Sequence, residues 1–303
     1  MKATAVSLRN LVGGESTRAR LRETTIKFRL LWRNKLARVC LVVIATEIVI
    51  ATFAPIIVPY PEDVTTGMHV KQALQSPSWS HLFGTDEFGR DLFSRVLYGT
   101  RISLGAAAAA VALALLIGVP LGAIAGGVGG WVDDVIMRIC DVFLSFPSVL
   151  LAIAIAVFLG PSLQNAIIAI VVTWWPGYTR LIRSQAVSLK ERQFVRSATA
   201  IGSKRRAIVF RHVLPNAMGP TVVSASLDFG FVILTLAALS FLGLGAQPPT
   251  PEWGLMVNTS RNYFLDSWWY MAFPGVAVTL TVLAFNVLGD GLREVLDPKS
   301  RTY

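Results

Sequence analysis

The hydrophobic positions of the chain gather into long apolar stretches separated by polar segments. Several approach or exceed the ~20 residues that a helix needs to cross a bilayer. We therefore predict an all-α protein with six transmembrane helices. The predicted spans are Ala37–Val58, Ile102–Ala125, Val135–Gly160, Leu163–Tyr178, Met218–Ala246 and Trp268–Leu288. Pro147 is expected to interrupt the third span, and Trp174–Gly177 is expected to break the fourth near its inner end, either as a hinge or as an ordinary helix end.

Composition agrees with a polytopic membrane protein. Of 303 residues, 53% are hydrophobic and only 15% are charged, and the mean hydropathy is +0.57. The net charge of +10 does not indicate nucleic-acid binding, because the basic residues are concentrated beside the spans. Ten of the 28 Lys and Arg precede Cys40 and nine lie between Arg180 and Arg211. Since cytoplasmic segments carry such an excess, both regions and both termini are predicted to be cytoplasmic.

The same pattern divides the chain into a basic cytoplasmic segment, 1–38, and a six-helix membrane domain, 39–303. The first span is expected to remain as an anchor, because it follows a long polar segment and is too long for the core of a signal peptide. Four connecting segments of the domain are given a side of the membrane. They are an extracytoplasmic loop 59–101, a cytoplasmic loop 180–216, an outer loop 247–267 and a cytoplasmic tail 289–303.

Enzyme chemistry has little support in the sequence. The phosphate-binding pattern Gly-x-x-x-x-Gly-Lys-Ser/Thr is absent, so the chain is not itself an ATPase. His69, His81 and His212 fit no zinc spacing, and no metal site or catalytic residue is predicted. Cys40 and Cys140 lie in or beside apolar spans, which argues against a disulfide framework.

Three acidic residues lie within apolar spans, at Glu47, Asp141 and Asp228. Ionisable groups there are costly, by roughly 2.5–3.5 kcal/mol, and usually face the bundle interior or a water-filled path. Asp228, with Ser224 and Ser226, is the candidate for a substrate path, and a hydrogen-bonded structural carboxylate is the equal alternative. Asp141 is expected to pair with Arg138, three residues before it on the same helix.

The segment Gln193–Asn216 predicts a short helical hairpin. Phe194, Ala198 and Ile201 recur on one helical face. Gly202 is placed to end the first helix in the left-handed conformation.

Two further residues complete the predicted hairpin. Ser203 is placed to cap the second helix, and Pro215 is expected to end it. A basic loop serving only as a topology signal is the alternative.

A second polar block, His81–Arg95, precedes the second span. Its glycines allow tight turns and its charged residues are able to pair in a compact outer loop, although a solvated charged loop is the simpler expectation from spacing alone. The residues singled out are Gly84, Asp86, Gly89, Arg90, Asp91 and Arg95.

Several of these blocks resemble one family. Ala198, Gly202 and the run His212–Pro215 are similar to the EAA loop of ATP-binding-cassette (ABC) importer permeases. By that resemblance the loop is the coupling helix that contacts the ATPase subunit. The residues carried over are Arg196, Ser197, Ala198, Gly202, Ser203, His212, Leu214 and Pro215. Where the family often has Glu-Ala-Ala, this chain has Arg-Ser-Ala.

The blocks His81–Arg95, Ser240–Gly254 and Leu288–Pro298 resemble permeases of the dipeptide, oligopeptide and nickel class, specifically the six-helix "C" partner. The resemblance implies the type I ABC importer permease fold in the cell (inner) membrane. It implies a second homologous permease subunit, two ATPase subunits that carry ATP and Mg, and an extracytoplasmic substrate-binding protein. It also places Glu47 on an outer helix, near the partner permease.

The implied function is to form half of the pathway for dipeptides or oligopeptides. Within the class, nickel, a nickel chelate or glutathione is the alternative cargo. Outside the class, the alternatives are a self-contained secondary transporter and a membrane receptor or scaffold. The first of these would have inverted repeats, and the sequence has no clear internal repeat.

Overall fold

The computed structural model describes Trp32 and residues 34–203, 205–209 and 213–296. The described part of the chain is helical, with one isolated β-bridge between Thr85 and Asp91, which confirms the all-α prediction. The α-helices are α2 (Lys35–Ile57), α3 (Leu92–Val128), α4 (Gly130–Leu144), α5 (Ser148–Leu159), α6 (Leu163–Lys190), α7 (Gln193–Ala200), α8 (Arg205–Ile208), α9 (Leu214–Phe241), α10 (Trp253–Ser260) and α11 (Trp268–Leu296). Short 3₁₀ turns are η1 (Pro61–Val64), η2 (Val70–Gln72) and η4 (Arg261–Tyr263).

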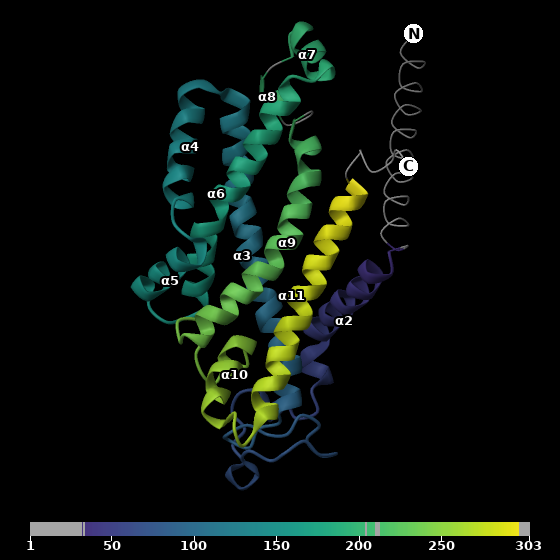
Figure 1. Ribbon diagram of the computed structural model, residues 1–303, viewed down its shortest axis with the longest axis vertical. Helices are drawn as coiled ribbons and strands as arrows, with labels where there is room; N and C mark the ends of the chain where they lie inside the picture. The colour runs from purple at the N-terminus through teal and green to yellow at the C-terminus, as the bar shows by residue number, and fades with distance from the viewer. Residues whose placement is uncertain (1–31, 33, 204, 210–212, 297–303) are drawn as a thin grey trace, which may run out of the picture.

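The long helices run between two different ends of the molecule (Figure 1). The short helices α7 and α8 lie at one end, whereas α10 and the loop between α2 and α3 lie at the other. Helices α3, α6, α9 and α11 connect these ends, with α4 and α5 beside α6 and with α2 beside α11. The predicted hairpin and the predicted outer loops are therefore on opposite sides of the bundle.

The closest packing in the bundle joins α3 to α6. Gly118, Gly122 and Gly126 repeat at four-residue intervals along one face of α3. A Cβ at position 118 would lie 2.7 Å from the carbonyl oxygen of Trp175, and one at position 122 would meet the carbonyl oxygen of Thr179 at a distance no real Cβ adopts. Small residues at this spacing let two helix backbones touch. The glycine stripe therefore fixes where α6 lies.

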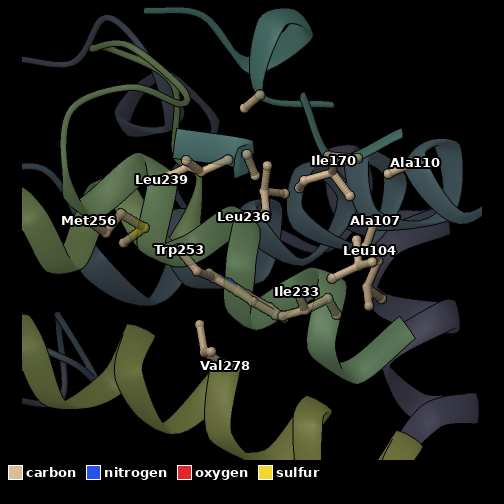
Figure 2. Packing of buried hydrophobic residues seen from close by; sticks show 14 of the residues in the cluster. Leu104, Ala107, Ala110, Ile170, Ile233, Leu236, Leu239, Trp253, Met256 and Val278 are labelled. Carbon is tan, nitrogen blue, oxygen red and sulfur yellow. The ribbon is translucent and has the colours of Figure 1, made fainter. Parts of the chain in front are cut away.

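A hydrophobic core fills the space between these helices (Figure 2). Its labelled members come from five helices and are Leu104, Ala107, Ala110, Ile170, Ile233, Leu236, Leu239, Trp253, Met256 and Val278. Trp253 begins α10, is fully buried, and donates from its indole N–H to the carbonyl oxygen of Val96, at 3.0 Å. This bond ties the start of α10 to the start of α3.

Among the described residues, four helices are long and apolar enough to cross a membrane, namely α2, α3, α9 and α11. Helices α4 and α5 are together long and apolar enough to form one further span. The chain bends by 85° between them. The break comes at Pro147, as the sequence predicted, because the residue before a proline leaves the α region.

The expected break in the fourth span is wrong. Pro176 lies inside α6, which continues to Lys190 without interruption. One proline removes a single backbone hydrogen bond, and packing against a neighbouring helix can offset that loss. Here the glycine stripe of α3 packs against α6 on both sides of the proline. The apolar half of α6 is thus rigidly joined to its polar, basic half.

We expect Gly122→Leu to destabilise the protein and Gly105→Leu to be tolerated. Both glycines lie in α3, but a Cβ at position 105 meets nothing within 4 Å, whereas position 122 faces the backbone of α6. Overpacking of this kind costs about 1–3 kcal/mol. The measurement is the thermal unfolding midpoint of the purified protein in detergent. Equal midpoints for the two variants would contradict the packing described here.

Candidate functional site

The predicted hairpin is present and turns at Gly202. Helix α7 ends at Ala200, and Gly202 has φ +81°, in the left-handed region expected of it. The backbone N–H of Ser203 donates to the carbonyl oxygen of Ala198, at 3.1 Å, and closes the end of α7. Helix α8 begins at Arg205. The hydrogen bond of Ser203 therefore closes the end of α7.

The buried face of α7 differs from the predicted one. Val195 is 2% exposed and packs in a small cluster with Ala186 of α6 and Val213, while Phe194 is 44% and Ile201 is 83% exposed. Of the three positions predicted to share one helical face, only Ala198 is buried, and Ile201 lies after the end of α7. A different face of α7 is buried because α7 packs against the C-terminal part of α6. The periodicity of α7 alone does not show this contact. Two large apolar side chains are left on the surface.

Pro215 does not end the second helix of the hairpin. It lies in the first turn of α9, directly after Leu214, where the missing proline N–H would have no helical partner in any case. Leu214 is half-buried. The predicted coupling residue His212 lies outside the described residues, as do most of segment 1–38 and the end of tail 289–303.

Arg196, which stands where the resembled motif has an acid, forms an ion pair with Glu191. Both side chains are exposed. Ser197 is on the same helix and lines a groove of about 1400 Å³ that also touches Pro215. The groove lies between α6, α7, α9 and the end of α11.

Asp228 lies near the middle of α9, beside the inner end of this groove. Ser224 lines the groove and donates from its hydroxyl to Oδ2 of Asp228, at 3.2 Å. Trp174 and Tyr178 of α6 lie beside the same carboxylate. Ser226 does not join the cluster. Its hydroxyl is buried and has no hydrogen-bond partner in the described part of the chain, because a residue two positions away points to another side of a helix.

The other two acids within predicted spans hold helices together. Glu47 accepts a hydrogen bond from the hydroxyl of Thr281, at 2.7 Å, so this carboxylate joins α2 to α11. Asp141 pairs with Arg180 of α6, at 2.6 Å, and the expected pair with Arg138 is wrong. The competing partner comes from another helix, which spacing along α4 does not show.

A second pair between the same two helices was missed by the sequence analysis. Arg183 donates two hydrogen bonds to Asp133, at 2.7 and 2.9 Å. Together the two pairs tie α4 to the basic half of α6.

The charged residues of the block His81–Arg95 pair with one another and are buried, as the sequence allowed but spacing did not favour. Arg90 donates to Asp86 at 2.7 Å, and Arg95 lies 3.5 Å from the same carboxylate. Arg95 also donates to the carbonyl oxygen of Val64, at 2.8 Å. The solvated-loop alternative is therefore wrong, because these charged groups satisfy one another within a folded loop.

Asp91 organises the start of α3. Its carboxylate accepts from the backbone N–H of Ser94, at 2.8 Å, and contacts the ring nitrogen of His81, at 2.9 Å. Gly84 and Gly89 have φ +77° and +78°, which accounts for glycine at both turns. The loop is thus a folded cap at the start of α3.

Glu252 is a buried carboxylate that the sequence analysis did not single out. It caps α10 by accepting from the backbone N–H groups of Gly254 and Leu255, at 3.0 and 2.8 Å. Burial raises its pKa, against the opposing effect of these hydrogen bonds. The signal available in the sequence was its position directly before a helix that begins with Trp253.

Comparison with known families matches two parts of the chain. Residues 118–302 match the family described as binding-protein-dependent transport system inner membrane component. Residues 26–77 match the N-terminal transmembrane domain of oligopeptide transport permease C. The first match covers the hairpin and the C-terminal blocks and confirms the resemblance found there, whereas residues 81–95 lie between the two matched parts.

Similar proteins cover most of the chain. A dipeptide transport system permease protein of Alkalihalophilus pseudofirmus is 50% identical over 275 residues, which are 91% of this chain and 90% of that protein. A probable D,D-dipeptide transport system permease protein of Escherichia coli is 51% identical over 227 residues, 75% and 76% of the two chains. A glutathione transport system permease protein of Escherichia coli is 43% identical over 298 residues, 98% and 97%. The chain therefore belongs to the family of binding-protein-dependent transport system inner membrane components, and it is a permease subunit of an ABC importer rather than an enzyme.

Proposed function

We propose that this permease subunit forms half of the membrane pathway through which a dipeptide, delivered by an extracytoplasmic binding protein, enters the cell. The cargo is supported by the 50% identity to a dipeptide permease over nine-tenths of the chain. Glutathione is the second candidate, because a glutathione permease is 43% identical over nearly the whole chain. The two cargoes share a free α-amino group and free carboxylates.

The proposed topology has six spans, with α6 and the bent pair α4–α5 added to the four long apolar helices. Segment 1–38, loop 180–216 and tail 289–303 face the cytoplasm, and loops 59–101 and 247–267 face outwards. The positions of the basic residues support this orientation. The hairpin α7–α8 and α10 lie at opposite ends of the bundle, which supports placing them on opposite sides of the membrane (Figure 1).

The observation that carries the coupling role is the way in which the hairpin is held. α7 begins two residues after the end of α6 and packs on α6 through Val195, and α8 and then α9 come next along the chain. A force on the hairpin therefore reaches α9, which carries Asp228, and α6, which lies beside this carboxylate. Ile201, exposed beside the turn at Gly202, supplies an apolar contact for an ATPase subunit.

The proposed complex contains this chain, a homologous permease, two ATPase subunits and a binding protein. ATP and Mg bind to the ATPase subunits. Closure of those subunits moves the hairpin, and α6 transmits the movement because it is continuous through Pro176 and paired to α4. The buried outer cap around Asp86 and Asp91 gives the opposite end a fixed shape.

Cysteine labelling tests the topology. In a chain carrying Cys40→Ser and Cys140→Ala, we expect an impermeant thiol reagent added to intact cells to label Trp79→Cys and Leu265→Cys. The original side chains are 98% and 94% exposed. Ile201→Cys, equally accessible on the proposed cytoplasmic side, should react only after permeabilisation. Labelling of Ile201→Cys in intact cells would overturn the orientation.

The hairpin turn gives the test of coupling. At φ +81° any β-carbon adds about 1–2 kcal/mol of strain, although a Cβ at Gly202 meets no neighbour within 4 Å. We expect Gly202→Val to reduce both the uptake of labelled dialanine and the ATP hydrolysis stimulated by the loaded binding protein. The complex is assayed in liposomes with all its partners.

Gly202→Asn is the matched control, because asparagine tolerates the left-handed region. It should retain most of both activities. Normal stimulated hydrolysis and uptake in a correctly inserted Gly202→Val complex would contradict the coupling role. Competition of dialanine uptake by glutathione at equal concentration would favour the second cargo.

A further inference from the structure

The groove of about 1400 Å³ follows one face of α9 from the hairpin to the middle of the helix. On α9 it touches Asn216, Pro220 and Ser224, which recur every four residues. Its other walls come from α6, α7 and the end of α11. The groove therefore leads from the hairpin end of the molecule to the level of Asp228.

Asp228 is surrounded by neutral groups. The hydroxyl of Ser224 donates to it, and Trp174 and Tyr178 lie beside it. No Lys or Arg forms an ion pair with this carboxylate in the part of the chain that the structure describes. Neutral donors solvate a carboxylate but leave its charge in place. Two aromatic rings next to an unneutralised carboxylate are a favourable environment for a ligand ammonium group.

Arg293 lies at an axial distance from Asp228 that is similar to the length of a dipeptide. Arg293 of α11 lines the same groove, and Gly289, one turn before it, lies against Leu227 of α9. Since α9 and α11 run in opposite directions, the axial offset between Asp228 and Arg293 is about five residues, or ~8 Å. The two residues of an extended dipeptide span about 7 Å.

We propose that Asp228 and Arg293 bind the two charged ends of a zwitterionic dipeptide in the groove. Asp228, with Trp174 and Tyr178, takes the protonated α-amino group, and Arg293 takes the terminal carboxylate. This inference rests on the proposed peptide cargo and names the residues of this chain that contact it.

The charge of the site is tested by thiol labelling of the complete complex without nucleotide. The background carries Cys40→Ser and Cys140→Ala, and the reporter is Ser224→Cys. A cationic methanethiosulfonate should modify the introduced thiol faster than an anionic one of similar size. Asp228→Asn should lower this cation-to-anion rate ratio by about tenfold, and Asp228→Glu should preserve it. An unchanged ratio in Asp228→Asn overturns the site.

Gly219→Cys is the matched control. Position 219 lines the same groove but lies nine residues from Asp228, ~13 Å along α9. The rate ratio there should change less than twofold in Asp228→Asn. A similar loss at both positions would mean a general change of the groove and would overturn the local assignment.

Protection by cargo tests the ligand. Dialanine should slow modification of Ser224→Cys, whereas N-acetyl-dialanine and dialanine amide should not. Arg293→Gln, a change at an exposed position, should weaken protection by dialanine at least several-fold. Equal protection by N-acetyl-dialanine would overturn the inference about Asp228 and Arg293. Uptake of dialanine by the wild-type complex would in that case still support peptide import. Absence of dialanine uptake would overturn the cargo and the inference together.

Discussion

The close contact of α3 with α6 is the constraint on which the rest of the structure depends. Glycines at 118, 122 and 126 bring the two backbones together along three turns. This contact supports α6 where it continues as a helix past Pro176 to Lys190. The hairpin, the groove and the environment of Asp228 all follow from the position of α6, because α6 contributes to each of them.

Charged side chains pair at both ends of the bundle, but the pairs differ in how deeply they are buried. At the outer end, the Asp86–Arg90 and Asp91–His81 contacts are enclosed and hold a loop in one shape. At the hairpin end, the exposed Arg180–Asp141 pair contributes little to stability. Such a pair can be exchanged at small free-energy cost during a movement. The charged pairs in the loop before α3 are therefore more enclosed than the Arg180–Asp141 pair between α4 and α6.

The sequence predicted what depends on composition and local chemistry. The helical class, the break at Pro147 and the positive φ of Gly202 were all confirmed, whereas the solvated loop that spacing favoured for the charged residues around Asp86 was wrong. It failed where a distant segment decides the outcome. Arg180 replaces Arg138 as the partner of Asp141 because another helix brings it close.

Two further differences have the same origin. Val195 rather than Phe194 faces inward, because α7 docks on α6. The surroundings of Asp228 come from Trp174 and Tyr178, about fifty residues earlier, so spacing within α9 indicated Ser224 but also, wrongly, Ser226.

The central claim is that the tip of the α7–α8 hairpin contacts an ATPase subunit. Its most direct test is photo-crosslinking of the assembled, transport-active complex with benzoylphenylalanine in place of Ile201, and in place of Leu265 as a control at the opposite end. The account predicts an adduct between the Ile201 probe and an ATPase subunit, with a yield that changes when ATP is added, and no such adduct from the Leu265 probe. An active complex in which the Ile201 probe reacts only with lipid, or with no protein, would contradict it.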